Sequence, residues 1–361
     1  MTDFIKQPGD GKRRYPFTIV TPGAEFIKGL RKRVEYGRRD NRAYLDALPA
    51  PPSGGRITGS FIYAHPPDYI GRPTLDYNAA DWRQLLQELK ELGIDTVIYQ
   101  AVAWNWGAVR QCYYRSQVFA GYQTWNALDP LIQAVADEGM TLYLGGQGSD
   151  AGYLEEVDIG QSDQMLCLRE LLAAYPGGFH GFYMSPETLF PGQRRPKLEQ
   201  ALNRYYSRAC QEIKNLAPDL PIVASPVTHY IEGKEQEIHD FLYNVFQGCP
   251  LDYMSPQDSI GTFRNRLPYL EPAFEIWKQV CDELGFTLWV NVESFERATI
   301  GTTNDFVPAA FERLRVQLAN AHRCGEKIVT WEAPYFYSPL AGERGSKLRA
   351  DYLAYLKADT F

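Results

Sequence analysis

The chain lacks the features that mark membrane, redox and many metal-dependent proteins. No apolar run approaches the length needed to cross a bilayer, so we expect no membrane span. The 6 cysteines form no CxxC pair, and the 5 histidines show neither HxxH nor HExxH spacing. We therefore expect reduced cysteines, no metal site and no cofactor. A metal-dependent isomerase, lyase or aldolase stays open as an alternative, because distant ligands can converge in space.

Positive charge is also scarce. The formal net charge is -7, which argues against general affinity for nucleic acids or anionic membranes, because both need a positive field. The amino terminus, MTDFIKQPGDGKRRYPF, lacks the continuous apolar stretch and small-residue cleavage site of a secretory signal. We expect a cytoplasmic protein.

Motifs for nucleotide binding and for a nucleophilic serine are missing as well. The Gly-rich stretch GGQGSDAG from Gly145 fits neither GxGxxG nor GxxxxGK[ST], so it indicates a loop rather than a phosphate site. No GxSxG sequence occurs.

Eight short runs rich in β-branched and aromatic residues recur along the chain. Each is bounded by Gly, Pro, Asn or Asp, which is typical of strands that are buried on both faces. The runs begin at Ile57, Thr96, Thr141, Gly181, Ile222, Asp252, Thr287 and Lys327.

Helical patterns alternate with these runs. Leu85, Leu86 and Leu89 share one face of a predicted helix, and Gly93 is placed to end it. Seven later segments follow the same logic, within 127–140, 164–175, 198–216, 238–247, 271–285, 309–325 and 346–356. Eight strands alternating with eight helices predict an α/β protein with a single (β/α)8 TIM barrel from Gly55 to Phe361.

Residues 1–54 differ from the rest and form a basic N-terminal arm and linker. Residues 1–50 contain eleven Lys and Arg against six Asp and Glu. We expect a helix between Ala24 and Ala47 that covers the bottom of the barrel or a neighbouring subunit, so a homo-oligomer stays open.

Two glutamates follow predicted strands in the way that barrel enzymes place their chemistry, at the carboxyl ends. Glu187 follows the fourth run in GFYMSPETLF, and Glu293 follows the seventh in LWVNVESFER. Cleavage of a glycosidic bond needs one carboxylic acid to protonate the leaving oxygen and one carboxylate to attack or to activate water. The two glutamates are therefore our predicted catalytic pair.

Further polar and aromatic residues lie near other strand ends, and sugars bind to flat rings edged by polar groups. We predict a supporting or reserve role for Asp258, Glu332, Gln257, Asn291 and Tyr337, with a rim hydroxyl such as that of Tyr337 keeping Glu293 ionised. We predict substrate contacts from His65, Trp104, Trp106, Tyr63, His229, Trp331 and Tyr335.

The motifs GSFIY, LGIDTVIYQ, GMTLYLGG, GFYMSPE, SPQDSIG, WVNVESF and YFYSP occur in this order between Gly59 and Pro339. With them the chain resembles domain-of-unknown-function family 4434, regarded as glycoside-hydrolase-like TIM barrels. By analogy with the larger clan of such barrels, the resemblance implies Glu187 as acid/base and Glu293 as nucleophile. Ser-Pro precedes Glu187 here, where that clan commonly has Asn.

The sequence thus predicts a glycoside hydrolase acting on an oligosaccharide or glycoside. A non-catalytic carbohydrate-binding barrel remains the alternative from a different class, and binding without turnover would distinguish it.

Overall fold

The computed structural model describes residues 24–63, 77–106, 109–149, 162–298 and 306–358. His65 and the side chain of Trp106, both predicted to contact the substrate, lie outside the described residues.

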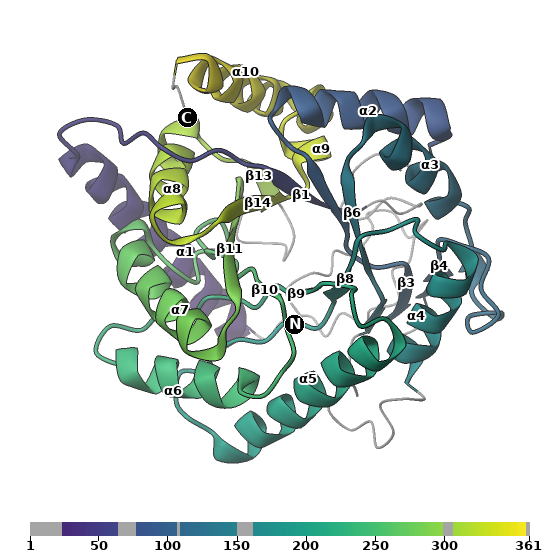
Figure 1. Cartoon of the computed structure of the whole chain (residues 1–361). Coiled ribbons are helices and arrows are strands. Elements are labelled where there is room, and N and C mark those ends of the chain that lie inside the picture. Colours follow the sequence, from purple (N-terminus) through teal and green to yellow (C-terminus); the bar gives the residue numbers. More distant parts are fainter. Residues whose placement is uncertain (1–23, 64–76, 107–108, 150–161, 299–305, 359–361) are drawn as a thin grey trace.

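Eight parallel strands close into a barrel in the spatial order β1, β14, β11, β10, β9, β8, β6, β2. Helices surround this ring of strands (Figure 1). The strands are Gly59–Ile62 (β1), Thr96–Tyr99 (β2), Thr141–Gly145 (β6), Gly181–Met184 (β8), Ile222–Ala224 (β9), Tyr253–Met254 (β10), Thr287–Val292 (β11) and Lys327–Trp331 (β14). All eight lie within the predicted runs, and the (β/α)8 prediction is confirmed.

The outer helices also follow the predicted segments. They are Ala79–Glu91 (α2), Leu128–Glu138 (α3), Asp163–Ala174 (α4), Pro196–Leu216 (α5), Glu235–Phe246 (α6), Leu270–Leu284 (α7), Phe311–Cys324 (α8) and Gly342–Ala358 (α10). Gly93 has a φ of 81° just after α2, which is the left-handed geometry expected where a helix ends at glycine. Short helical turns cover Leu267–Tyr269 (η5), Ala333–Phe336 (α9) and Pro339–Ala341 (η6).

Two small sheets were not predicted. Ala103–Trp106 (β3), Val109–Cys112 (β4), Gln123–Thr124 (β5) and Gln147–Ser149 (β7) form one, and Phe295–Arg297 (β12) pairs with Phe306–Pro308 (β13) in the other. The segment AWNWGAVRQCYYRSQ therefore contains an antiparallel strand pair. Both sheets lie in segments that follow barrel strands, on the side of the barrel where the chemistry is expected.

The N-terminal helix α1 (Ala24–Ala47) packs beside the same end of the barrel. Leu30 and Val34 are buried against Phe263, which follows β10. The Asn41 side chain accepts a hydrogen bond from the backbone of Leu267 at 2.8 Å. The expectation that this helix covers the bottom of the barrel is wrong. Its apolar face packs against the loop after β10, at the carboxyl ends of the strands.

Aromatic rings fill the interior of the barrel. Tyr253 stacks on Trp289 with ring centroids 4.3 Å apart, and Tyr143 meets Trp289 edge to face at 5.7 Å. A side chain at Gly181 would overlap the ring of Tyr143, so glycine makes room for it. Phe61 and Tyr183, 5.1 Å apart, lie where this packed interior meets the open end. The site described below therefore has a rigid aromatic floor.

All six cysteines are free, as the sequence predicts. In the part of the chain that the structure describes, no helix is long and apolar enough to cross a membrane.

Candidate active site

One cavity lies at the carboxyl ends of the barrel strands. The cavity itself is small, with a volume of about 30 Å³. The wider hollow that contains it, including the space at its mouth, has a volume of about 430 Å³. Its walls are Phe61, Gln100, Tyr183, Glu187, Ser225, Gln257, Thr262, Asn291, Glu293, Phe295 and Trp331. Both glutamates of the predicted pair line it.

Glu187 reaches the cavity from the Ser-Pro turn after β8. Its Oε1 accepts a hydrogen bond from Gln257 Nε2 at 3.0 Å. Burial raises the pKa of Glu187 above its usual value, and the bond from Gln257 acts in the opposite direction. A carboxyl group in this environment keeps its proton to higher pH than one in water.

Glu293 reaches the cavity directly after β11 and is only 2% exposed. Its carboxyl accepts the Thr262 backbone N–H at 2.7 Å and the Thr262 hydroxyl at 3.3 Å. Burial, and after it the negative charge of Asp258, raise the pKa of Glu293 to about 8. The rim hydroxyl beside Glu293 is thus that of Thr262, and it does not offset the cost of burying the charge.

A tight turn brings Thr262 to Glu293. Ser259 and Phe263 both have positive φ, 61° and 57°, which is uncommon for residues other than glycine. A side chain at Gly261 would overlap the carbonyl oxygen of Phe295, so the turn needs glycine there. Backbone strain of this kind often accompanies functional sites, and here it lies in the turn that holds one carboxyl group.

Asp258 lies beneath Glu293 and is fully buried. Its Oδ2 accepts a hydrogen bond from Gln317 Nε2 at 2.6 Å, and its Oδ1 accepts the backbone N–H groups of Ile260 at 3.1 Å and Glu293 at 3.2 Å. Burial raises the pKa of Asp258. The two acids interact, so they titrate as a pair rather than separately.

Arg313 of α8 supports the same strand end from behind. Its Nη2 donates to the backbone carbonyls of Glu293 at 2.7 Å and of Phe295 at 2.8 Å. The guanidinium is buried, and its charge partly offsets the rise in the pKa values of Glu293 and Asp258. Arg313 does not line the cavity.

The structure brings together only some of the residues predicted for the site. Five line the cavity: Glu187, Glu293, Gln257, Asn291 and Trp331. Tyr63 extends the aromatic wall, since its ring lies 6.3 Å from that of Trp331 and 5.0 Å from that of Trp104.

Besides Tyr63 and Trp104, five predicted residues of the described chain do not line the cavity. Asp258 lies beneath Glu293, and the other four contact residues elsewhere. The Glu332 carboxylate accepts the backbone N–H of Tyr63. Tyr337 packs on Tyr352 at 5.5 Å, so it is not the hydroxyl beside Glu293. His229 is bonded through Nδ1 to the carbonyl of Phe190 at 2.9 Å, and the ring of Tyr335 lies against Phe336 at 5.2 Å.

Several lining residues were missed by the sequence analysis. Tyr183 lies inside one predicted strand and Gln100 is the last residue of another, and alternation along a strand marks inward-facing positions. Thr262 sits in a turn with no recognisable motif. Ser225 follows β9 and was treated only as part of a strand.

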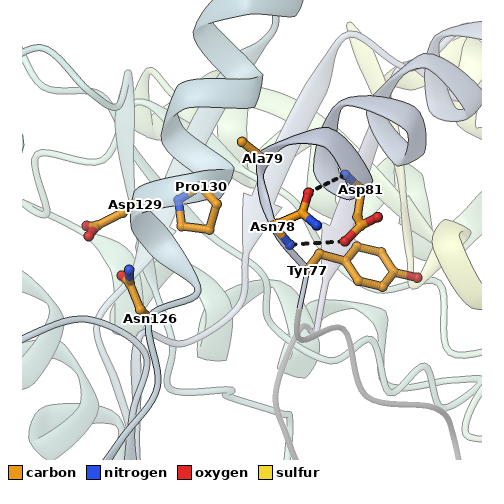
Figure 2. A pocket seen from close by; sticks show the side chains of 7 residues that line it. All are labelled: Tyr77, Asn78, Ala79, Asp81, Asn126, Asp129 and Pro130. Carbon is orange, nitrogen blue, oxygen red and sulfur yellow. Dashed lines mark hydrogen bonds between the residues drawn. The ribbon is translucent and has the colours of Figure 1, made fainter.

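A second hollow lies between the start of α2 and the start of α3, shown in Figure 2. Its volume is about 610 Å³, but it is an open groove. Asn78 and Asp81 bond to each other's backbone as the cap of α2, and Asp129 accepts the Tyr175 hydroxyl at 2.6 Å. Its polar groups thus stabilise local structure, and we assign no site there. Among the described residues, no group of three or more His, Cys, Asp or Glu side chains is arranged to hold a metal ion.

The fold and the position of the cavity define a (β/α)8 barrel with a candidate site at the carboxyl ends of its strands. The chain belongs to the family described as "Domain of unknown function (DUF4434)", whose model matches residues 57–342. The comparison with curated proteins finds no match.

Solved structures with this fold include a putative alpha-L-fucosidase from Bacteroides thetaiotaomicron VPI-5482, with 22% identity, a TM-score of 0.69 and coverage of 86% of this chain and 99% of that chain. A GH18 chitinase from Pseudoalteromonas aurantia is more distant, with 11% identity, a TM-score of 0.49 and coverage of 82% and 98%. At 22% identity, the likeness to the first of these structures establishes the fold alone.

Proposed function

We propose that the protein is a glycoside hydrolase in which Glu187 and Glu293 form the catalytic carboxyl pair. The observation that carries this proposal is that both side chains line one cavity at the carboxyl ends of β8 and β11, in surroundings that raise both pKa values. Pairs of carboxyl groups with perturbed pKa values in a cleft are typical of general acid and base chemistry.

In the proposed reaction, Glu187 protonates the leaving oxygen and Glu293 acts as nucleophile or base. The raised pKa of Glu187 suits a proton donor. Glu293 must be ionised to act, and because burial and the negative charge of Asp258 raise its pKa to about 8, the ionised fraction increases as the pH rises toward and past that value. The backbone N–H of Thr262 then stabilises the charge on Glu293.

The aromatic wall supports a sugar as the ligand. Trp331 lines the cavity, and Tyr63 and Trp104 continue from it. Such rings stack on the apolar faces of sugars. Because Trp331 lines the cavity, we expect tryptophan fluorescence to change when a sugar binds.

The first test is Glu187→Gln and Glu293→Gln, assayed on a panel of nitrophenyl glycosides and oligosaccharides that includes alpha-L-fucosides. Each substitution should lower kcat by about 10²–10⁴-fold, the usual contribution of a general acid or base. The matched control is Glu271→Gln, on the exposed surface of α7, which should leave kcat unchanged.

Wild-type turnover in either cavity variant removes that residue from the pair. Binding of sugars by the wild type without turnover across the panel would instead identify a carbohydrate-binding barrel.

A further inference from the structure

The amide of Asn291 has an unpartnered oxygen in the wall of the buried site. Asn291 is 5% exposed and lines the cavity, and its Oδ1 has no hydrogen-bond partner. Buried polar atoms without a partner are rare and costly, so this one calls for an explanation.

The orientation of that amide is fixed by its neighbours. Asn291 Nδ2 donates to Ser225 Oγ at 3.2 Å, and Ser225 Oγ donates to the carbonyl of Ser255 at 2.7 Å. A hydroxyl has one proton, which the Ser255 carbonyl takes, so Ser225 accepts from Asn291. The amide nitrogen therefore faces Ser225, and the oxygen is left for a ligand.

Two other side-chain donors in the wall, those of Gln257 and Trp331, already donate to acceptors within the protein. Gln257 Nε2 donates to Glu187 at 3.0 Å and to the carbonyl of Ser225 at 3.2 Å. Trp331 Nε1 donates to Gln100 Oε1 at 2.7 Å. Among these lining groups, Asn291 Oδ1 is therefore an acceptor that is open to a ligand hydroxyl.

The charge of the wall points in the same direction. Among the described residues that line the cavity, none is Lys, Arg or His, whereas two are glutamates. Arg313, close behind, directs its Nη2 to backbone carbonyls. A carboxylate, sulfate or phosphate on the ligand would find no cation to pair with among the described lining residues, which is strongly unfavourable in a desolvated site.

We propose that the sugar residue bound in this cavity is uncharged, that one of its hydroxyls donates to Asn291 Oδ1, and that uronic acids and sulfated or phosphorylated sugars are excluded. This inference rests on the proposed function for the idea that the ligand is a sugar. It goes further in stating which chemical class of sugar the wall selects.

The test compares matched pairs that differ only at C6: nitrophenyl glucosides against glucuronides and galactosides against galacturonides, in both anomers. Binding to the wild type is measured by calorimetry, and turnover is measured separately. We expect the neutral member of at least one pair to bind about 100-fold more tightly than its uronide.

Asn291→Leu removes the acceptor and should weaken binding of that neutral sugar by about 10–100-fold, the effect of losing a buried hydrogen bond. Asn291→Asp keeps an acceptor of the same size and should retain more affinity than Asn291→Leu. Asn126→Leu, in the outer groove, is the control and should bind as the wild type does. Circular dichroism establishes that each variant is folded.

The outcomes separate the two proposals. Neutral sugars that bind through Asn291 without being cleaved leave this inference standing and remove the hydrolase. Cleavage of uronides at equal or greater efficiency keeps the hydrolase and overturns the inference. Failure of every neutral sugar to bind, or equal affinity in wild type and Asn291→Leu, also overturns it.

Discussion

Asp258 is the residue that most affects how Glu293 works. It lies below the cavity wall, and its negative charge adds to burial in raising the pKa of Glu293 to about 8. Without this neighbour, burial would raise the pKa of Glu293 without an added negative charge. Asp258 is therefore a positioning residue that controls when Glu293 carries charge.

Asp258→Asn should move the Glu293 ionisation to lower pH. If Glu293 acts as a carboxylate, kcat/KM of the wild type rises as the pH increases through about 8. The substitution should move this rising limb of the pH profile to lower pH, because the charge of Asp258 no longer raises the pKa of Glu293. The new amide keeps an acceptor for the N–H of Ile260, and Gln317 has an unpartnered Oε1 that can turn to accept from it.

The measurement is the pH dependence of kcat/KM, with Asp351→Asn on the surface of α10 as the control. If the rising limb lies at the same pH in Asp258→Asn and in the wild type, Asp258 does not raise the pKa of Glu293. A limb that falls through about 8 in the wild type would exchange the roles of Glu187 and Glu293.

At the scale of elements, the turn between β10 and α7 connects the site to the N-terminal helix. Thr262 bonds to Glu293, and the next residue, Phe263, packs on Leu30 and Val34 of α1. Arg38 of α1 also donates to the carbonyl of Ala298 at 3.1 Å, in the segment after β12. The basic arm thus supports two loops at the open end of the barrel.

Gly261→Ala should disrupt this turn. The added methyl overlaps the carbonyl of Phe295, so we expect a loss of about 1–3 kcal/mol in stability and a lower kcat, because Thr262 shifts away from Glu293. Gly29→Ala is the matched control, since nothing lies within 4 Å of its added methyl and helix propensity favours alanine. Chemical denaturation and steady-state kinetics measure both effects; unchanged values for Gly261→Ala would mean that the turn is not constrained as described.

Strands and helices were predictable from sequence because each carries its own periodic pattern of apolar residues. Glu187 and Glu293 were predictable as cavity residues because parallel strands place their ends together. Thr262, Gln317 and Arg313 were not, since they reach Glu293 from a strained turn and from the buried face of α8. The packing of α1 could not be predicted either, because its partner Phe263 is more than 200 positions away in the chain.

For the whole molecule, the buried acids carry a cost in stability. Glu293 has a folded-state pKa of about 8 against a usual value of 4.5, so the folded state holds a proton that the unfolded state has lost between these values. The stability contributed by this group is fully present below about 4.5 and is lost as the pH rises to about 8. Each pH unit in this window removes up to about 1.4 kcal/mol.

Glu293→Gln should therefore have a larger free energy of unfolding than the wild type. The difference between the two should increase from pH 4.5 to about 8 and stay constant above that. Glutamine fills the same space and keeps an acceptor for the Thr262 N–H, but it has no charge to bury. Urea denaturation at several pH values measures the margin, with Glu271→Gln as the exposed control. A margin independent of pH, or a less stable variant at pH 8, would contradict the raised pKa. A variant that is more stable but inactive would show that the wild type keeps this carboxyl for function, because nothing in folding favours a buried charge here.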